Sequence, residues 1–259
     1  MRRTLFKAVS RRAVLLVLGL LMALRVEAHA AEVTVAVAAN FTAPAKEIAE
    51  KFKAQTGYSV DLSFGATGQF YTQITQGAPF DILLSADSAR AQKAEKEGWA
   101  VTGTRFTYAI GKLVLWSADP ALVDQEGAVL KSGRFTHIAI ANPSAAPYGA
   151  AAVETMKALG LYKQIEPKLV TGENINQTFQ FIVSGNAELG FVALSQAIEA
   201  GKGSSWTVPE NLHAPILQDA VLLKQGEQNT FAKAFFTFLK SPDALAIIKR
   251  YGYDLPSGS

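Results

Sequence analysis

The stretch VTVAVAANFTAPAKEIAEKFKAQTG, residues 33–57, joins a short apolar run to a longer segment of helical spacing. The apolar, β-branched run at its start is typical of a buried strand. Ile48, Ala49 and Phe52 then follow at helical spacing, and Gly57 is suited to end a helix. This stretch therefore predicts a strand that leads through a short turn into a helix.

The same alternation continues along the chain. Further strands are predicted in the runs YSVDLSF, DILLSA, GKLVLWSA, THIAIAN, KLVTGEN, LGFVALS and DAVLLKQ. Helices are predicted near residues 69–76, 89–98, 150–160, 177–184 and 196–200, and over most of residues 229–253. Strands that alternate with helices indicate an α/β fold with parallel sheets covered on both faces. The sequence has no cysteine, which excludes thiol catalysis and cysteine-ligated metal sites.

The first 30 residues have the pattern of an export signal. Arginines and a lysine precede an apolar run over residues 13–24, and Ala28 and Ala30 form a small-residue cleavage motif. The apolar run is shorter than the ~20 residues that span a bilayer. A cleaved signal peptide over residues 1–30 and a periplasmic location are therefore predicted, with the export route left open.

The charge of the chain depends on this leader. Six of the 25 basic residues and one of the 22 acidic residues lie within it, so the mature chain has 19 basic and 21 acidic residues and a net charge of −2. The basicity of the precursor thus belongs to the targeting signal. Proteins that bind nucleic acids are usually basic, and the mature chain is not. No nucleic-acid partner is therefore predicted.

Four strand-to-helix turns could bind a ligand, since ligands of parallel α/β sheets lie beyond the carboxyl ends of the strands. These turns surround Asn40, Thr67, Tyr148 and Ile175, and none of them contains arginine or lysine. Free N–H groups at helix N-termini favour anions. The turns therefore predict an anion site made of neutral donors. The alternative is that Asn40 and Thr67 only cap their helices.

Several stretches together resemble the periplasmic molybdate-binding proteins of ABC transporters. They are VAVAANFTAPAKEIAEKFKAQTG, QITQGAPFDILLSAD, FTYAIGKLVLWSADP, IAIANPSAAPYGAAAVETMKALG, ELGFVALSQA and AIIKRYGYDLP. The resemblance implies a two-lobed type 2 periplasmic binding fold, with crossings near Lys112 and Ala220. One lobe would comprise residues 31–111 plus 221–259, and the other residues 112–220.

The resemblance also implies a function. The protein would bind molybdate or tungstate in the cleft between the lobes and deliver it, as a monomer, to a membrane permease. Molybdenum would enter only as the oxyanion, without a direct protein ligand, and no further cofactor is expected.

The family's binding positions can be transferred to this sequence. Asn40 and Thr67 would donate side-chain hydrogen bonds to the ligand, and Tyr148 and Ile175 would donate backbone N–H groups. Many relatives have a tyrosine where this chain has Ala193, and some have a hydroxyl residue in place of Ala39. We therefore expect both amide N–H groups of Asn40 to serve the ligand.

The alternatives to this function are the binding of another oxyanion and an enzymatic activity. Another tetrahedral oxyanion, sulfate above all, is the main alternative ligand, whereas a protonated anion such as phosphate would need a buried acceptor. An enzyme is not indicated, because His137 and His213 suggest no Ser-His-Asp geometry. Asp81 and Asp87 flank a strand, and Asp87 is expected to cap the following helix.

Overall fold

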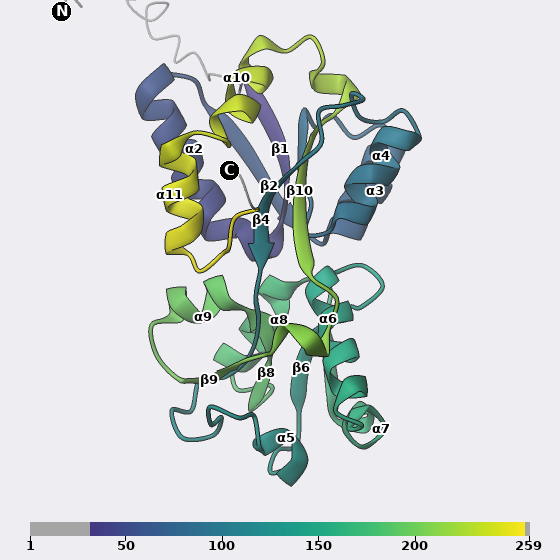
Figure 1. Cartoon of the computed structure of the whole chain (residues 1–259), viewed down its shortest axis with the longest axis vertical. Helices are drawn as coiled ribbons and strands as arrows, with labels where there is room; N and C mark the ends of the chain where they lie inside the picture. The colour runs from purple at the N-terminus through teal and green to yellow at the C-terminus, as the bar shows by residue number, and fades with distance from the viewer. Residues whose placement is uncertain (1–31, 257–259) are drawn as a thin grey trace, which may run out of the picture. The chain divides into compact units, whose positions relative to one another are not determined.

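The computed structural model describes residues 32–256, so the signal peptide predicted for residues 1–30 lies outside the described residues. The strands are β1 (Val33–Ala38), β2 (Val60–Gly65), β3 (Ile82–Leu84), β4 (Phe106–Gly111), β5 (Leu113–Ser117), β6 (Ile138–Ala141), β7 (Leu169–Gly172), β8 (Leu189–Ala193), β9 (Ser204–Thr207) and β10 (Ile216–Leu222). They form two five-stranded sheets, in the orders β2-β1-β3-β10-β4 and β7-β6-β8-β5-β9. Each sheet with its helices is called a lobe below, the first lobe containing β1 and the second lobe β6 (Figure 1).

Helices cover the sheets of both lobes. The first lobe has η1 (Ala39–Phe41), α2 (Thr42–Thr56), α3 (Thr67–Thr75), α4 (Ser88–Lys96), η4 (Lys224–Gly226), α10 (Thr230–Phe238) and α11 (Pro242–Arg250). The second lobe has α5 (Val129–Ser132), α6 (Pro147–Ala158), α7 (Tyr162–Ile165), η2 (Glu166–Lys168), α8 (Ile175–Val183), α9 (Leu194–Ala200) and η3 (Glu210–Leu212). Over the described residues, no helix combines the length and apolar character needed to cross a membrane.

The period-two pattern of the strands explains why helices lie on both faces of the first sheet. Val35 and Val37 of β1 pack into the cluster beneath α2, α10 and α11. Ala36, between them in sequence, packs on the opposite face with Phe70 of α3 and Ala91 of α4. Figure 1 shows α2 and α11 on one side of the strands and α3 and α4 on the other. Because both faces of β1 are buried, its sequence is apolar except for the partly buried Thr34 near its start.

Both sheets are mixed, which differs from the expectation of parallel sheets. β10 runs antiparallel to β3 and β4, and β5 runs antiparallel to β8 and β9. The reason is the path of the chain, which passes from β4 into β5 and returns from β9 into β10. The first strand after each crossing, β5 or β10, therefore runs opposite to the other strands of its sheet.

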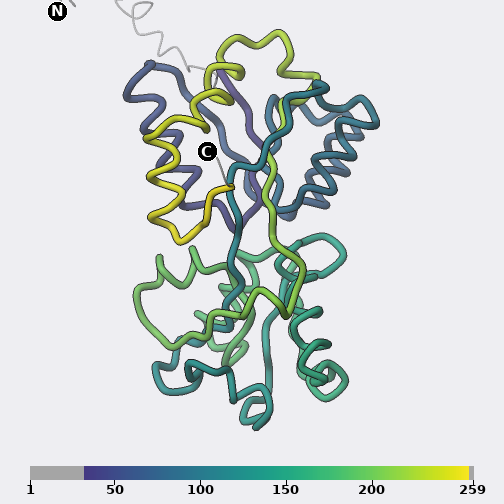
Figure 2. Tube along the Cα trace, in the orientation of Figure 1, coloured from purple at the N-terminus to yellow at the C-terminus, as the bar shows by residue number. Residues whose placement is uncertain are grey.

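The first crossing lies at Lys112, between β4 and β5, where it was predicted. The second crossing lies between Thr207 and Ile216, earlier than the predicted position near Ala220, which is inside β10 and pairs with Leu84. Gln218 and Asp219 interrupt the apolar pattern of β10. The residues before Asp219 were therefore predicted to be part of a loop. Figure 2 shows the two crossing segments beside each other, as the pairing of β4 with β10 requires.

The sequence placed most elements correctly but missed two strands and several helix starts. β4 and β9 were not predicted as separate strands. Helices α3, α6 and α9 begin two or three residues before their predicted starts, directly after Ala66, Ala146 and Ala193. Alanine is a poor N-cap by preference, so the sequence offered no capping signal at these positions.

We predict that the ion pair between Arg105 and Asp219 stabilises the β4–β10 pairing. Asp219 is fully buried, and its carboxylate accepts hydrogen bonds from Arg105 Nη1 at 2.6 Å and from Thr107 Oγ1 at 2.7 Å. Arg105→Met leaves this charge without its cation, so urea unfolding should show a loss of about 3 kcal/mol. Lys93→Met, which breaks an exposed pair with Glu97, should lose no more than about 0.5 kcal/mol. Equal losses would contradict the prediction.

Candidate functional site

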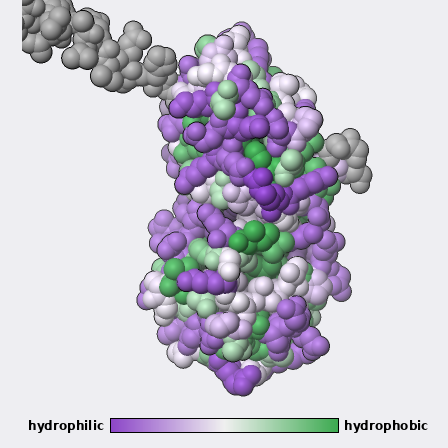
Figure 3. Space-filling view, turned by 90° about the vertical axis from the view of Figure 1, so that its left-hand side faces the viewer, coloured by the Kyte–Doolittle hydropathy of each residue, from purple (hydrophilic) through white to green (hydrophobic). Residues whose placement is uncertain are grey.

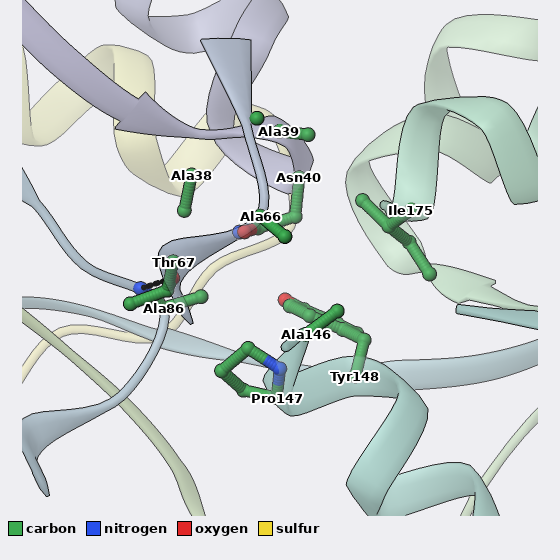
Figure 4. A pocket seen from close by; sticks show the side chains of 11 residues that line it. Ala38, Ala39, Asn40, Ala66, Thr67, Ala86, Ala146, Pro147, Tyr148 and Ile175 are labelled. Carbon is green, nitrogen blue, oxygen red and sulfur yellow. Dashed lines mark hydrogen bonds between the residues drawn. The ribbon is translucent and has the colours of Figure 1, made fainter. Parts of the chain in front are cut away.

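A small pocket at the junction of the two lobes is lined by all four of the turns predicted from the sequence. Asn40 and Thr67 line it from the first lobe, and Tyr148 and Ile175 line it from the second (Figure 4). The other lining residues are Ala38, Ala39, Gly65, Ala66, Ala86, Ala146 and Pro147. Within the described part of the chain, none of the residues that line this pocket is charged. An occupant would therefore meet neutral groups only.

Helix N-termini surround this pocket. Among the lining residues, Thr67 begins α3, Pro147 begins α6 and Ile175 begins α8, while η1 leads into α2 at the fourth turn. The N–H groups of a first helical turn have no partner inside the helix. The helix dipole adds roughly half a positive charge at each N-terminus. The pocket therefore favours a negatively charged occupant.

Thr67 supplies a hydroxyl to this pocket. The N-cap of α3 is Ala66, and Thr67 is the first helical residue, so the alternative that Thr67 only caps the helix is wrong. Its buried Oγ1 accepts a hydrogen bond from Ala86 N at 3.0 Å. Within residues 32–256, this is the only hydrogen bond that the hydroxyl makes. Its proton is therefore available to an acceptor in the pocket.

Asn40 is held by a buried network. Its Nδ2 donates to Gln218 Oε1 at 2.8 Å and to the Tyr253 hydroxyl at 3.1 Å. Its backbone carbonyl accepts from the Tyr253 hydroxyl at 2.7 Å and from Ser195 Oγ at 3.0 Å. The expectation that the Asn40 amide donates both N–H groups to a ligand is not met, because both serve protein partners. A capping role is also excluded, since the N-cap of α2 is Phe41.

Tyr148 offers a group that the sequence did not suggest. Its hydroxyl points into the pocket (Figure 4) and accepts a hydrogen bond from Gln218 Nε2 at 3.2 Å. Because that bond occupies a lone pair of the oxygen, the Tyr148 proton is directed either to the neighbouring Tyr253 hydroxyl or to an acceptor in the pocket. Burial, with smaller contributions from Tyr253 and Tyr108, raises the pKa of Tyr148 well above its usual value. The hydroxyl therefore stays protonated at neutral pH.

Sequence reasoning missed the residues behind the pocket. Gln218 and Tyr253, which bond to Asn40, lie 178 and 213 positions away from it in the chain. The Tyr108 hydroxyl donates to Gln218 Oε1 at 3.0 Å and completes this part of the network. One signal was present, because Gln218 and Asp219 are two fully buried polar residues inside an apolar strand. Buried polar groups need partners, so such a pair indicates a network.

The two alanines that depart from the family pattern lie in different places. Ala39 lines the pocket. Ala193 is fully buried and is the N-cap residue of α9, but it is not among the residues that line the pocket. The tyrosine hydroxyl in this pocket belongs instead to Tyr148. The structure therefore gives no support to compensation for Ala193 by the Asn40 side chain.

The two lobes are also hydrogen-bonded to each other beside the pocket. These bonds join Gly68 N to Ala145 O at 2.9 Å, Arg90 Nη2 to Ser144 O at 2.7 Å and Asn176 Nδ2 to Thr42 Oγ1 at 2.9 Å. Gly68, Ala145 and Asn176 directly adjoin pocket-lining residues in the sequence. The described arrangement is therefore a closed one, in which both lobes contribute to one site.

The residues considered for other chemistry lie elsewhere. Over residues 32–256, no three His, Cys, Asp or Glu side chains come together in a way that could hold a metal ion. His137 is exposed, and His213 Nδ1 lies 2.7 Å from Ala214 O; neither lines the pocket. Asp87 caps α4 by accepting from Arg90 N at 2.7 Å, as predicted.

Comparisons with known proteins agree with this geometry. Residues 33–254 match the family model described as bacterial extracellular solute-binding protein. The chain is 60% identical over 236 residues to the molybdate-binding protein ModA of Rhodobacter capsulatus, covering 91% of this chain and 93% of that protein. It is 55% identical over 251 residues to ModA of Azotobacter vinelandii, covering 96% and 98%. The solved Azotobacter vinelandii periplasmic molybdate-binding protein superposes with a TM-score of 0.84 at 43% identity, over 86% of this chain and 99% of that one.

We predict that the buried tyrosines make the protein sensitive to alkali. Burial is the largest cause that raises the pKa of Tyr253 to about 12. Between about pH 10 and pH 12 the unfolded chain loses this proton while the folded chain keeps it. The free energy of unfolding should therefore be unaffected by this group below about pH 10 and should fall above it by about 1.4 kcal/mol per pH unit.

The measurement is urea unfolding across this alkaline range. Tyr253→Phe should make the decline shallower by that amount. Ser195→Ala is the matched control, because it removes a hydrogen bond to the same hydroxyl but no titrating group, and so it should lower stability without changing the slope. A slope that Tyr253→Phe leaves unchanged would refute the prediction.

Proposed function

The chain belongs to the bacterial extracellular solute-binding protein family, and we propose that it captures molybdate or tungstate and delivers it to an ABC permease. The observation that carries this proposal is the convergence of four turns on one uncharged pocket. Asn40 and Thr67 from the first lobe and Tyr148 and Ile175 from the second are the proposed ligand-binding residues. The high identity to two proteins named for molybdate binding supports the choice of ligand.

Neutral donors are sufficient for such an anion. Hydrogen bonds to a charged oxygen are roughly twice as strong as those between neutral groups. The hydroxyls of Thr67 and Tyr148 and the first-turn N–H groups can each donate one. The helix N-termini, at roughly half a positive charge each, together offer about as much positive charge as a dianion carries negative charge. No arginine or lysine is needed to hold the ligand.

The donor set also selects among anions. A protonated oxyanion presents an O–H group that would meet other donors in this pocket, leaving an unfavourable contact. An unprotonated dianion meets only complementary groups. Molybdenum would thus be held through its oxygens, without a protein atom bound to the metal and without a further cofactor.

We infer export to the periplasm with removal of residues 1–30, action as a monomer and no catalytic activity. A permease would recognise the closed lobes together. The face in Figure 3 is mostly hydrophilic, with apolar side chains gathered near the boundary of the lobes. Ile198 on α9 is one of the exposed large apolar side chains, at 45% exposure.

We predict that calorimetric titration of the purified protein will show tight binding of molybdate and tungstate. Sulfate should bind at least about a hundredfold more weakly, a difference of roughly 2.8 kcal/mol, because the resemblance implies a cavity fitted to the larger tetrahedron. Phosphate should not compete, because it retains a proton. Equal affinities for sulfate and molybdate would assign the protein to another oxyanion.

We predict that the Thr67 hydroxyl donates to the bound anion. Thr67→Val keeps the shape of the side chain but removes the donor, which should weaken molybdate binding about ten- to a hundredfold, or roughly 1.5 to 3 kcal/mol. Thr67→Ser keeps the hydroxyl and should bind nearly as the parent does. If the valine variant binds normally and only its melting temperature falls, the hydroxyl serves Ala86 alone.

A further inference from the structure

Gln218 lies outside the pocket but connects its two sides. It is fully buried in β10, the strand by which the chain returns to the first lobe. Gln218 pairs with Ala109 and the next residue with Thr107, so Tyr108 is an extra residue on β4. Such a bulge re-aims side chains. Here the Tyr108 hydroxyl reaches the Gln218 amide, which also bonds to Asn40 in the first lobe and to Tyr148 in the second.

The neighbours of Gln218 fix which end of its amide is oxygen. Tyr253 has one hydroxyl proton, and its shortest bond, at 2.7 Å, donates that proton to the Asn40 carbonyl. The Tyr253 oxygen therefore acts as an acceptor toward the Asn40 side chain, which must present its nitrogen. That nitrogen also donates to Gln218, so the Gln218 atom at this contact is oxygen.

The Tyr108 hydroxyl supports the same orientation. It lies 3.0 Å from Gln218 Oε1 and 3.3 Å from Ser85 O, so its better hydrogen bond also requires oxygen at this end of the amide. The amide nitrogen of Gln218 must then face Tyr148. It donates to the Tyr148 oxygen at 3.2 Å, so the Tyr148 proton points away from Gln218, either to the neighbouring Tyr253 hydroxyl or to a ligand oxygen.

We propose that Gln218 is a positioning residue that determines specificity, because it makes Tyr148 a donor to the pocket and so selects unprotonated oxyanions. This inference rests on the proposed function. With its lone pair occupied by Gln218, the Tyr148 hydroxyl can satisfy a ligand oxygen but cannot accept a proton from the ligand. The pocket then consists of donors from both lobes.

A carboxylate at position 218 would reverse this polarity. Gln218→Glu has nearly the same shape, but both of its oxygens accept hydrogen bonds. The Tyr148 proton would turn to the carboxylate, and the Tyr148 oxygen would present a lone pair to the ligand. The new negative charge would weaken the binding of every anion. The lone pair, in contrast, would favour the binding of an anion that carries an O–H group. The quantity that tests the proposal is therefore the ratio of the affinity for an unprotonated anion to the affinity for a protonated one.

The experiment is calorimetric titration with sodium molybdate and sodium arsenate in the same neutral buffer, where arsenate retains at least one proton. In Gln218→Glu the ratio of molybdate to arsenate affinity should fall at least about tenfold from the parent value. Gln218→Met is the matched control, because it removes the donor without adding an acceptor. Because it also frees the Tyr148 lone pair, it should weaken molybdate binding and lower the ratio as well, but by less than the glutamate variant, in which the Tyr148 proton turns away from the ligand.

The outcomes separate the inference from the proposed function. A parent protein that does not bind molybdate refutes the function. A parent that binds molybdate, with the ratio of the parent retained in both the glutamate and the methionine variants, overturns only the role of Gln218. If the glutamate variant does not fold, Tyr148→Phe decides: it should weaken molybdate binding at least about tenfold, and normal binding by this variant would overturn the inference.

Discussion

A doubly charged anion can be buried without a cationic side chain only if each of its oxygens meets hydrogen-bond donors. This requirement explains why the pocket lies where helix N-termini from both lobes converge, since no single helix terminus offers enough donors. It also explains the small side chains around the pocket, such as Ala39, Ala66 and Ala146. Alanine lets the backbone N–H groups approach a ligand closely. The chemistry of the site is therefore mainly that of the backbone.

The requirement extends to the groups behind the pocket. Asn40 can hold its backbone in place only because Gln218, Tyr253 and Ser195 satisfy its amide and carbonyl. These partners come from the strand that returns between lobes, from the C-terminal segment and from the second lobe. A buried polar network of this kind specifies one arrangement, because any unsatisfied member is expensive in free energy. The network thus ties the geometry of the site to the way the lobes meet.

Much of the fold follows from local sequence, and much of the site does not. The apolar run of β1, the helical spacing of Ile48 and Phe52 and the turn at Asn40 are local patterns, and they predicted the element and the pocket position correctly. The roles of side chains depend on partners that only the fold brings close. Asn40 was expected to donate both amide N–H groups to a ligand because the resemblance placed it in the site and Ala193 offers no donor. Gln218 instead accepts one of these N–H groups from 178 positions away.

The lack of ion pairs between the lobes, over the described residues, has a consequence for release. Among the described residues, the ion pairs lie within the first lobe or join Lys112 at the first crossing to Asp254. The lobes are instead held by hydrogen bonds such as those of Gly68 and Asn176, each worth about 1 kcal/mol net. A few such bonds give a closed state that a bound dianion can stabilise strongly. Opening the loaded lobes therefore requires a partner to offset mainly the free energy of ligand binding, since the bonds between the lobes add little to it.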